Sequence, residues 1–352
     1  MAKDRLLIYG ANGYVGEAAS RLAVEQGLNP VLAGRNGAKI DSLAAELGVE
    51  ARAFELDDVA AIDSALRDAR VVLHLAGPYL HTFKSMVDAC LRTGTHYLDI
   101  TGELPVLQAL AARDAEARER GVMVMPAVGL DSVPSDCLAA HLLRRLPGAS
   151  HLTLGLQVDG PAGLPPGTQR TMIELAPRPD RVIKNGSMRE ADARVVTRTI
   201  DFGKGPVTAV RFQAPDPYVV FHTTGIENIE MYVAMPMLLR VGYRLFRYLR
   251  PVFRSDAVRS FLKLLVLPGP SARAREQTVT HVWAEARDDE GRTAASRLHG
   301  PEGALVWTTR TALTVARKVL EGRAPHGFQT PAGAYGPDLV LESEGVVRED
   351  VR

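Results

Sequence analysis

Three glycines near the start of the chain have the spacing of a site that binds a dinucleotide. Residues 6–9 predict a short buried strand, Gly10, Gly13 and Gly16 follow, and an apolar helical pattern then begins. In such a turn the first glycine permits a sharp bend, the second lets the backbone approach a pyrophosphate, and the third lets the helix lie close to the strand. The N–H groups at the helix start then attract the phosphates, although an ordinary glycine-rich loop is the alternative. We expect cofactor contacts from Gly10, Asn12, Gly13, Tyr14, Val15 and Gly16.

The end of the second predicted strand carries Arg35 and Asn36 and no acidic residue. In a site for NAD, an Asp or Glu at this position binds the ribose 2′-hydroxyl. A guanidinium pairs instead with the 2′-phosphate of NADP, through two parallel hydrogen bonds. The tip of this strand therefore predicts NADP(H) as the cofactor, with contacts from Arg35 and Asn36. The alternative is a solvated arginine at a strand end.

Loops after the later predicted strands could complete the site. Ligands of open α/β sheets bind beyond the carboxyl ends of the strands. We therefore expect Ala76, Gly77 and Pro78, which follow the fourth predicted strand, to contact the cofactor. Asp57, after the third strand, would lie at the adenine edge, unless Asp57 and Asp58 serve to cap the next helix.

Two residues of these loops are candidates for catalysis. Tyr79 could donate a proton, because a phenol is a donor whose ring can be held in place, but it could equally form an aromatic wall for the nicotinamide. Asp131 could orient a catalytic partner or cap the next helix.

The order of these segments predicts an α/β fold with two parts. Strands alternate with helices through the first part, which is typical of a doubly wound parallel sheet of the Rossmann type. From Ser150 onward longer alternating segments predict a second α/β domain with a mostly antiparallel sheet. The predicted domains are residues 1–149, residues 150–323, and a tail of residues 324–352 that returns to the first domain. The strands predicted in the first domain are 6–9, 30–33, 51–56, 69–75, 96–100 and 122–126, and those in the second include 151–160, 193–199, 206–212, 278–287 and 294–298.

Composition limits the classes of protein and partner. The 352 residues, 46% hydrophobic and 24% charged, are typical of a globular protein with one very large or two ordinary domains. A net charge of +1 gives no overall attraction to nucleic acid, which is not an expected partner. Cys90 and Cys137 provide no disulfide framework and no metal cluster, which indicates a cytoplasmic protein without a metal site. The N-terminus has no signal-like apolar core, and no apolar run approaches the ~20 residues that span a bilayer.

Residues 231–267 form an unusual segment whose only acidic residue is Asp256. Arg240, Arg244 and Arg247 lie on one predicted helical stripe, and large apolar residues fill the other face. A basic amphipathic helix of this kind can lie in a membrane interface or hold an anionic acyl carrier. The alternatives are a helix that covers the sheet and a homodimer interface.

Five motifs resemble those of the saccharopine dehydrogenase-like family of NADP-binding oxidoreductases. They are GANGYVG at 10–16, AGRN at 33–36, GPY at 77–79, YLDITGE at 97–103 and PAVGLDSVPSD at 126–136, and TPA at 330–332 is similar to the family's returning tail. The resemblance implies a Rossmann domain, an α/β domain inserted before a tail that packs back onto it, and often a dimer.

The resemblance also implies a choice of reactions. Some members reduce an imine in lysine metabolism, others are trans-acting enoyl reductases, and a eukaryotic branch is associated with lipid droplets. The amino-acid branch requires several cations for substrate carboxylates, and in the second domain only Arg170 and Arg211 are isolated candidates. We therefore expect an NADPH-dependent reductase of a hydrophobic, acyl- or lipid-linked unsaturated substrate. The alternatives are a saccharopine-type amino-acid dehydrogenase and a non-catalytic NADP(H)-binding sensor or scaffold at a membrane surface.

Overall fold

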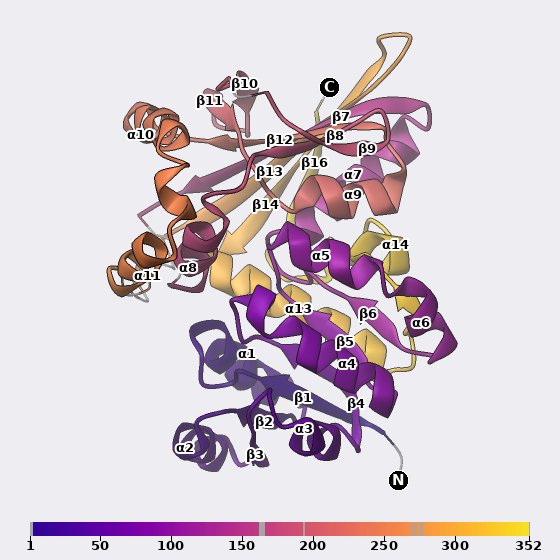
Figure 1. The fold of residues 1–352 in the computed structure, drawn as a ribbon. Helices are drawn as coiled ribbons and strands as arrows, with labels where there is room; N and C mark the ends of the chain where they lie inside the picture. Colours follow the sequence, from indigo (N-terminus) through magenta and orange to yellow (C-terminus); the bar gives the residue numbers. More distant parts are fainter. Residues whose placement is uncertain are drawn as a thin grey trace. The chain divides into compact units, whose positions relative to one another are not determined.

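The chain folds into two compact units in a computed structural model that describes residues 3–161, 166–192, 194–267, 269, 271, 273–274 and 277–351 (Figure 1). Unit 1 comprises residues 1–133 and 305–334, and unit 2 comprises residues 134–304 and 335–352. This grouping differs from the predicted division, because residues 134–149 group with the second unit and residues 305–323 with the first.

Unit 1 is built on a parallel sheet whose strand order is β15-β6-β5-β4-β1-β2-β3. Apart from β15, this is the Rossmann order, in which the chain crosses over between β1 and β4 and leaves a crevice for a ligand. The six predicted strands and the fold class are confirmed. The strands are β1 (Arg5–Tyr9), β2 (Val31–Gly34), β3 (Ala51–Ala53), β4 (Ala69–His74), β5 (His96–Asp99), β6 (Met123–Met125) and β15 (Gly327–Phe328).

Helices pack on this sheet through small and branched apolar residues. The central strands β1, β2 and β4 are almost wholly buried, as expected for a parallel sheet that is covered on both faces. The helices and the 3-10 turn of unit 1 are α1 (Tyr14–Glu25), α2 (Gly37–Leu47), α3 (Val59–Ala65), η1 (Tyr79–His81), α4 (Phe83–Thr93), α5 (Leu104–Ala111), α6 (Asp114–Glu119), α13 (Ala304–Leu320) and α14 (Pro331–Tyr335), the last two crossing the unit boundary by one residue.

Two segments from the end of the chain complete unit 1. Helix α13 buries Trp307 and Leu313, and the Thr311 hydroxyl donates to the Val128 carbonyl at 3.0 Å. These contacts place it with unit 1 rather than with the second domain. Strand β15 pairs with β6 and was not predicted, because two residues show no periodicity.

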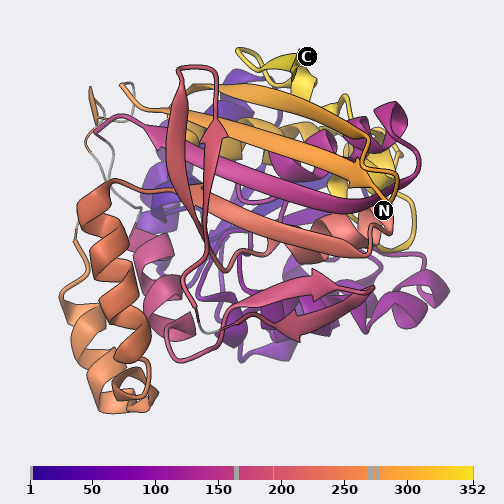
Figure 2. The same cartoon turned by 90° about the horizontal axis from the view of Figure 1, so that it is seen from above.

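Unit 2 contains a mixed sheet with the order β10-β11-β12-β7-β13-β14-β16, and the short strand β8 joins β12 to β9 (Figure 2). Within the described residues, β12 and β7 are its one parallel pair, so the expectation of a mostly antiparallel sheet is confirmed. The strands are β7 (Ala149–Asp159), β8 (Arg181–Lys184), β9 (Ser187–Glu190), β10 (Thr197–Asp201), β11 (Pro206–Arg211), β12 (Asn228–Ala234), β13 (Val279–Asp288), β14 (Thr293–Glu302) and β16 (Val347–Val351).

The structure corrects two expectations for unit 2. The strand predicted at 193–199 is β10, which lies further along the chain, and residue 193 lies outside the described residues. The predicted tail does not return to unit 1 as a whole: β15 pairs there, whereas β16 pairs with β14. The remaining helical elements of the described chain are α7 (Val133–Arg145), α8 (Pro166–Leu175), α9 (Asp216–Thr224), α10 (Met237–Tyr248), η2 (Val252–Arg254), α11 (Asp256–Leu264) and η3 (Leu339–Glu342).

Candidate functional site

The glycine turn connects β1 to α1 and is held by backbone hydrogen bonds. The Gly10 and Ala11 amides donate to the Ala33 carbonyl at 2.8 and 3.1 Å, and the Gly13 amide donates to the Gly10 carbonyl at 2.9 Å. Gly10 has a φ of +85°, and a Cβ on Gly16 would lie only 2.0 Å from the Gly10 oxygen. The sharp bend and the close approach of helix and strand therefore both require glycine. Gly13 is the N-cap residue of α1 and has no side chain to cap the helix, whose N-terminus therefore suits an anion.

Two other loops meet this turn. A Cβ on Gly10 would lie 2.9 Å from the Leu75 carbonyl carbon and 3.0 Å from the Ala76 nitrogen, so the loop after β4 passes directly beside Gly10. A Cβ on Gly34 would lie 3.2 Å from the Asn12 Oδ1, so the Asn12 side chain reaches the end of β2. Predicted cofactor residues from three loops thus gather at the crossover point of the sheet.

The tip of β2 presents Arg35 and Asn36 to solvent. The Asn36 Oδ1 accepts the Lys39 amide at 3.1 Å, so Asn36 caps helix α2. In the part of the chain that the structure describes, no carboxylate pairs with Arg35. Its guanidinium is therefore available to an anion at the position where a 2′-phosphate is expected.

The loop after β4 turns at a cis peptide bond between Gly77 and Pro78 and then buries Tyr79. Glu103, which is also fully buried, accepts the Tyr79 and Leu80 amides at 2.8 Å each. Two N–H donors on one carboxylate fix the loop relative to the start of α5.

The hydroxyl of Tyr79 points into the protein and donates to the His74 carbonyl at 3.3 Å. Burial raises the pKa of Tyr79 well above its ordinary value, and the carboxylates of Asp99, Glu103 and Asp131 raise it further. This geometry favours the aromatic wall over the proton donor, and the catalytic assignment stays a prediction. Asp131 is exposed in the turn before α7.

The family model described as "Saccharopine dehydrogenase NADP binding domain" matches residues 6–125. This segment is thus similar to that domain family. NADP(H) is therefore the cofactor of the NADP-binding domain, as the tip of β2 predicts. The residues present fit it, because the glycine turn, the uncapped start of α1 and the guanidinium of Arg35 lie on adjoining loops.

Two relatives and one solved structure are similar to this chain. A trans-acting enoyl reductase from Mycobacterium leprae is 34% identical over 149 residues, which cover 40% of this chain and 36% of that protein. A saccharopine dehydrogenase-like oxidoreductase from mouse is 30% identical over 186 residues, which cover 45% of this chain and 42% of that protein. Saccharopine dehydrogenase (L-Glu forming) from Saccharomyces cerevisiae shares the fold, with a TM-score of 0.68 and 15% identity over 99% of this chain and 100% of that chain. The matched region thus spans less than half the length of these curated relatives.

A histidine that the sequence analysis did not single out lies at the centre of the NADP-binding domain. His74 is fully buried at the end of β4, with its ring 5.6 Å from that of Tyr9, 5.5 Å from that of Tyr79 and 6.2 Å from that of Tyr97. Burial lowers the pKa of His74 to about 3. The only signal in the sequence was a histidine inside the apolar run VVLHLAG.

The neutral imidazole has a defined tautomer. The Thr82 hydroxyl donates to the Ala76 carbonyl at 2.7 Å, so its oxygen accepts from His74 Nε2 at 3.0 Å. The Nδ1 of His74 has no hydrogen-bond partner among the described residues. His74 therefore supports the loop that carries Ala76 and Pro78, and it does so without a charge.

Asp99, at the end of β5, organises the next two loops. Its Oδ1 accepts the Thr101 and Ala127 amides at 2.9 and 3.0 Å, and its Oδ2 accepts the Tyr97 hydroxyl at 2.7 Å. Burial raises the pKa of Asp99 to about 6, against these hydrogen bonds, which lower it. Ala127 adopts a φ of +59°, which one of these bonds holds in place.

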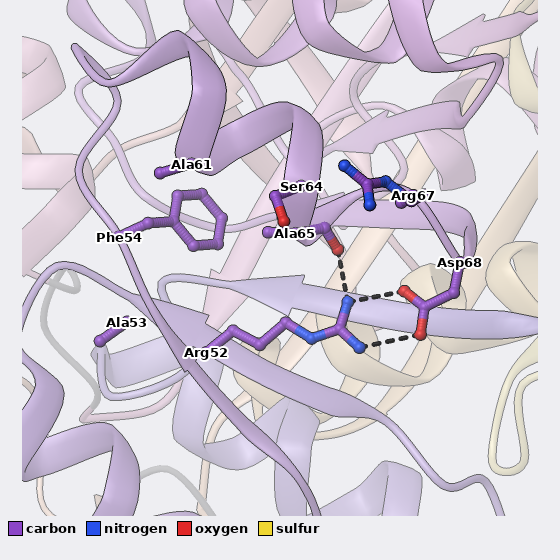
Figure 3. A pocket seen from close by; sticks show the side chains of 8 residues that line it. All are labelled: Arg52, Ala53, Phe54, Ala61, Ser64, Ala65, Arg67 and Asp68. Carbon is purple, nitrogen blue, oxygen red and sulfur yellow. Dashed lines mark hydrogen bonds and ion pairs between the residues drawn. The ribbon is translucent and has the colours of Figure 1, made fainter.

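The remaining predicted residue and a surface cavity lie near β3. Asp57 is exposed, and its neighbour Asp58 caps α3 by accepting the Ala61 amide at 2.9 Å. A cavity of about 570 Å³ opens between β3 and α3 (Figure 3), where Asp68 and the Ala65 carbonyl hold the Arg52 guanidinium. No predicted cofactor residue lines it; its lining is Arg52, Ala53, Phe54, Ala61, Ser64, Ala65, Arg67 and Asp68.

Proposed function

We propose that this chain is an NADPH-dependent reductase that saturates a carbon–carbon double bond in a hydrophobic, acyl- or lipid-linked substrate. The observation that carries the proposal is the NADP-binding domain, together with the 34% identity of its region to a trans-acting enoyl reductase. NADPH supplies a hydride to one carbon of the double bond, and the neighbouring carbon takes a proton from a protein group or water.

The chain's own residues would bind and orient the two reactants. The start of α1 and Arg35 would hold the pyrophosphate and the 2′-phosphate. The loop of Ala76, Gly77 and Pro78, fixed by Glu103 and His74, would form one wall of the nicotinamide site. Tyr79 supports this wall from within, and Asp131 is the exposed acidic group that could orient a proton-donating partner.

A saccharopine-type amino-acid dehydrogenase is the second candidate, since the fold matches that enzyme over nearly the whole chain. Its substrates carry several carboxylates, which need cations that are not already paired. Arg211 is buried and bonds to Glu230 at 3.3 Å and to the Asp192 carbonyl at 3.1 Å, which leaves it poorly suited to this task. Arg170 is exposed. These contacts favour the apolar substrate.

The test is NADPH consumption by the full chain with two groups of substrates. One group is α,β-unsaturated acyl thioesters of increasing chain length, and the other is amino-acid and keto-acid pairs that form imines. The proposal expects turnover that rises with acyl chain length. Turnover with the amino-acid pairs alone would establish the second candidate, and tight NADPH binding without turnover on either group would indicate the non-catalytic sensor.

A further inference from the structure

Helices α10 and α11, with η2 between them, expose a large apolar surface. We call residues 237–267 the apolar hairpin; Figure 1 shows its two orange helices one above the other, joined by η2, and α11 contacts η2 and α8. Neither η2 nor α11 has a buried residue, and Leu238 and Leu264 are each 82% exposed. The hairpin holds most of the exposed large apolar side chains of the described residues: Met237, Leu238, Leu239, Val241, Leu245, Leu249, Val252, Phe261, Leu264, Leu265 and Leu267.

The polar side of the hairpin contacts the rest of unit 2 through hydrogen bonds and ion pairs. The Asp180 carboxylate accepts Arg250 at 2.5 Å and the Tyr243 hydroxyl at 3.3 Å. Glu174 of α8 pairs with Lys263 and, at 3.5 Å, with Arg259. The usual arrangement of a surface helix is thus reversed, because ion pairs face the protein and leucines face outward. This excludes, within the described residues, the alternative that the apolar face covers the sheet.

Cations also lie on the exposed side of the hairpin. Arg244 and Arg254 are both exposed, and no carboxylate among the described residues pairs with either. The sequence from 237 to 267 contains seven Arg or Lys residues against Asp256 alone. A partner that binds this face must therefore combine an apolar layer with negatively charged groups beside it.

We propose that the apolar hairpin inserts into the interface of a membrane that contains anionic lipids. Such a surface supplies acyl chains for the leucines and phosphate groups for Arg244 and Arg254. A second copy of this chain would bring a like-charged hairpin against the first, which charge repulsion disfavours. Among the described residues no helix is both long and apolar enough to cross a bilayer.

Vesicle co-sedimentation of the full chain tests the proposal independently of any reductase activity. The protein should sediment with vesicles of phosphatidylcholine mixed with phosphatidylglycerol, and poorly with phosphatidylcholine alone. High salt should weaken the binding, since the Debye length shrinks. The double variant L238Q/L264Q should abolish sedimentation, and R244Q/R254Q should lower the partition coefficient by about tenfold or more at low salt.

Matched variants control for general effects of the substitutions. Val59→Gln replaces an exposed apolar residue of α3, Arg189→Gln replaces an exposed arginine of β9, and both should sediment like the parent. Thermal unfolding and NADPH titration should show that all variants remain folded. Absence of sedimentation with anionic vesicles at low salt would overturn the proposal. Dimerisation that L238Q/L264Q abolishes, without vesicle binding, would show that a second copy covers this face.

Discussion

Glu103 binds the backbone amide of Tyr79 at 2.8 Å, although 24 residues separate them, and with its second oxygen it binds the amide of Leu80. Glu103 is fully buried and lies at the start of α5. Its two hydrogen bonds therefore connect the loop after β4 to this helix. This loop carries Ala76, Gly77 and Pro78 toward the expected position of the nicotinamide. Its geometry thus depends on a residue that does not itself line the cofactor site.

Glu103→Gln should destabilise the protein by about 1–3 kcal/mol, because the amide group of glutamine accepts only one of the two N–H donors. The free energy of unfolding from urea titration measures this loss. The control is Glu55→Gln, which changes an exposed glutamate and should leave stability unchanged. Equal stability of Glu103→Gln and the parent would show that the Glu103 carboxylate does not hold the loop after β4.

Tyr79→Phe separates the two roles predicted for this tyrosine. If the ring forms a wall, loss of a buried hydroxyl that bonds to the His74 carbonyl should change kcat by less than about threefold, whereas loss of a general acid costs ~100-fold or more. Steady-state kinetics with a saturating unsaturated thioester measures the difference. A decrease in kcat of ~100-fold or more, with unchanged NADPH affinity, would support the role of Tyr79 as the proton donor.

Much of the NADP-binding domain could be predicted from the sequence, because its signals are local. The glycine turn, the arginine at the tip of β2 and six strand–helix alternations each occupy a few consecutive residues. The hydrogen bonds of Glu103 to the loop after β4 and the packing of His74 against three tyrosines join residues of different loops and strands. No spacing in the sequence therefore indicates them. The positions of α13 and β16 likewise depend on contacts with residues far away in the sequence.

Arg35→Ala should lower the affinity for NADPH and leave that for NADH unchanged, because only NADPH carries the 2′-phosphate. A charge-assisted contact of this type contributes about 1.5–3 kcal/mol, or roughly one to two decades in Kd. Calorimetric titration of both cofactors measures the two affinities. Arg67→Ala, at another exposed arginine of the same domain, should change neither. Equal affinities of the parent protein for NADPH and NADH would contradict the assignment of Arg35.

His74 should make the protein less stable in acid. Its pKa is about 3 in the folded protein, because of burial, against about 6.5 in an unfolded chain. The unfolded state therefore binds the proton at a higher pH than the folded state. The contribution of His74 to the free energy of unfolding is complete above pH ~6.5 and falls as the pH decreases toward 3. His96, which accepts the Met123 amide at 2.9 Å and whose pKa burial lowers to about 4, acts in the same direction.

The variant His74→Gln measures the share of His74 in this acid sensitivity. Unfolding titrations between pH 7 and 4.5 should show a slope smaller by up to about 1.4 kcal/mol per pH unit than in the parent. An unchanged slope in His74→Gln would mean that His74 is already protonated, or solvated, in the folded protein.

Transfer of deuterium from the cofactor to the product tests the proposed reaction most directly. The full chain is incubated with NADPH deuterated at C4 of the nicotinamide, on each face in turn, and a long-chain α,β-unsaturated acyl thioester. Mass spectrometry should find one deuterium in the saturated product with one of the two labelled cofactors and none with the other. A protein that binds NADPH yet yields no saturated, labelled product with either cofactor would contradict the account.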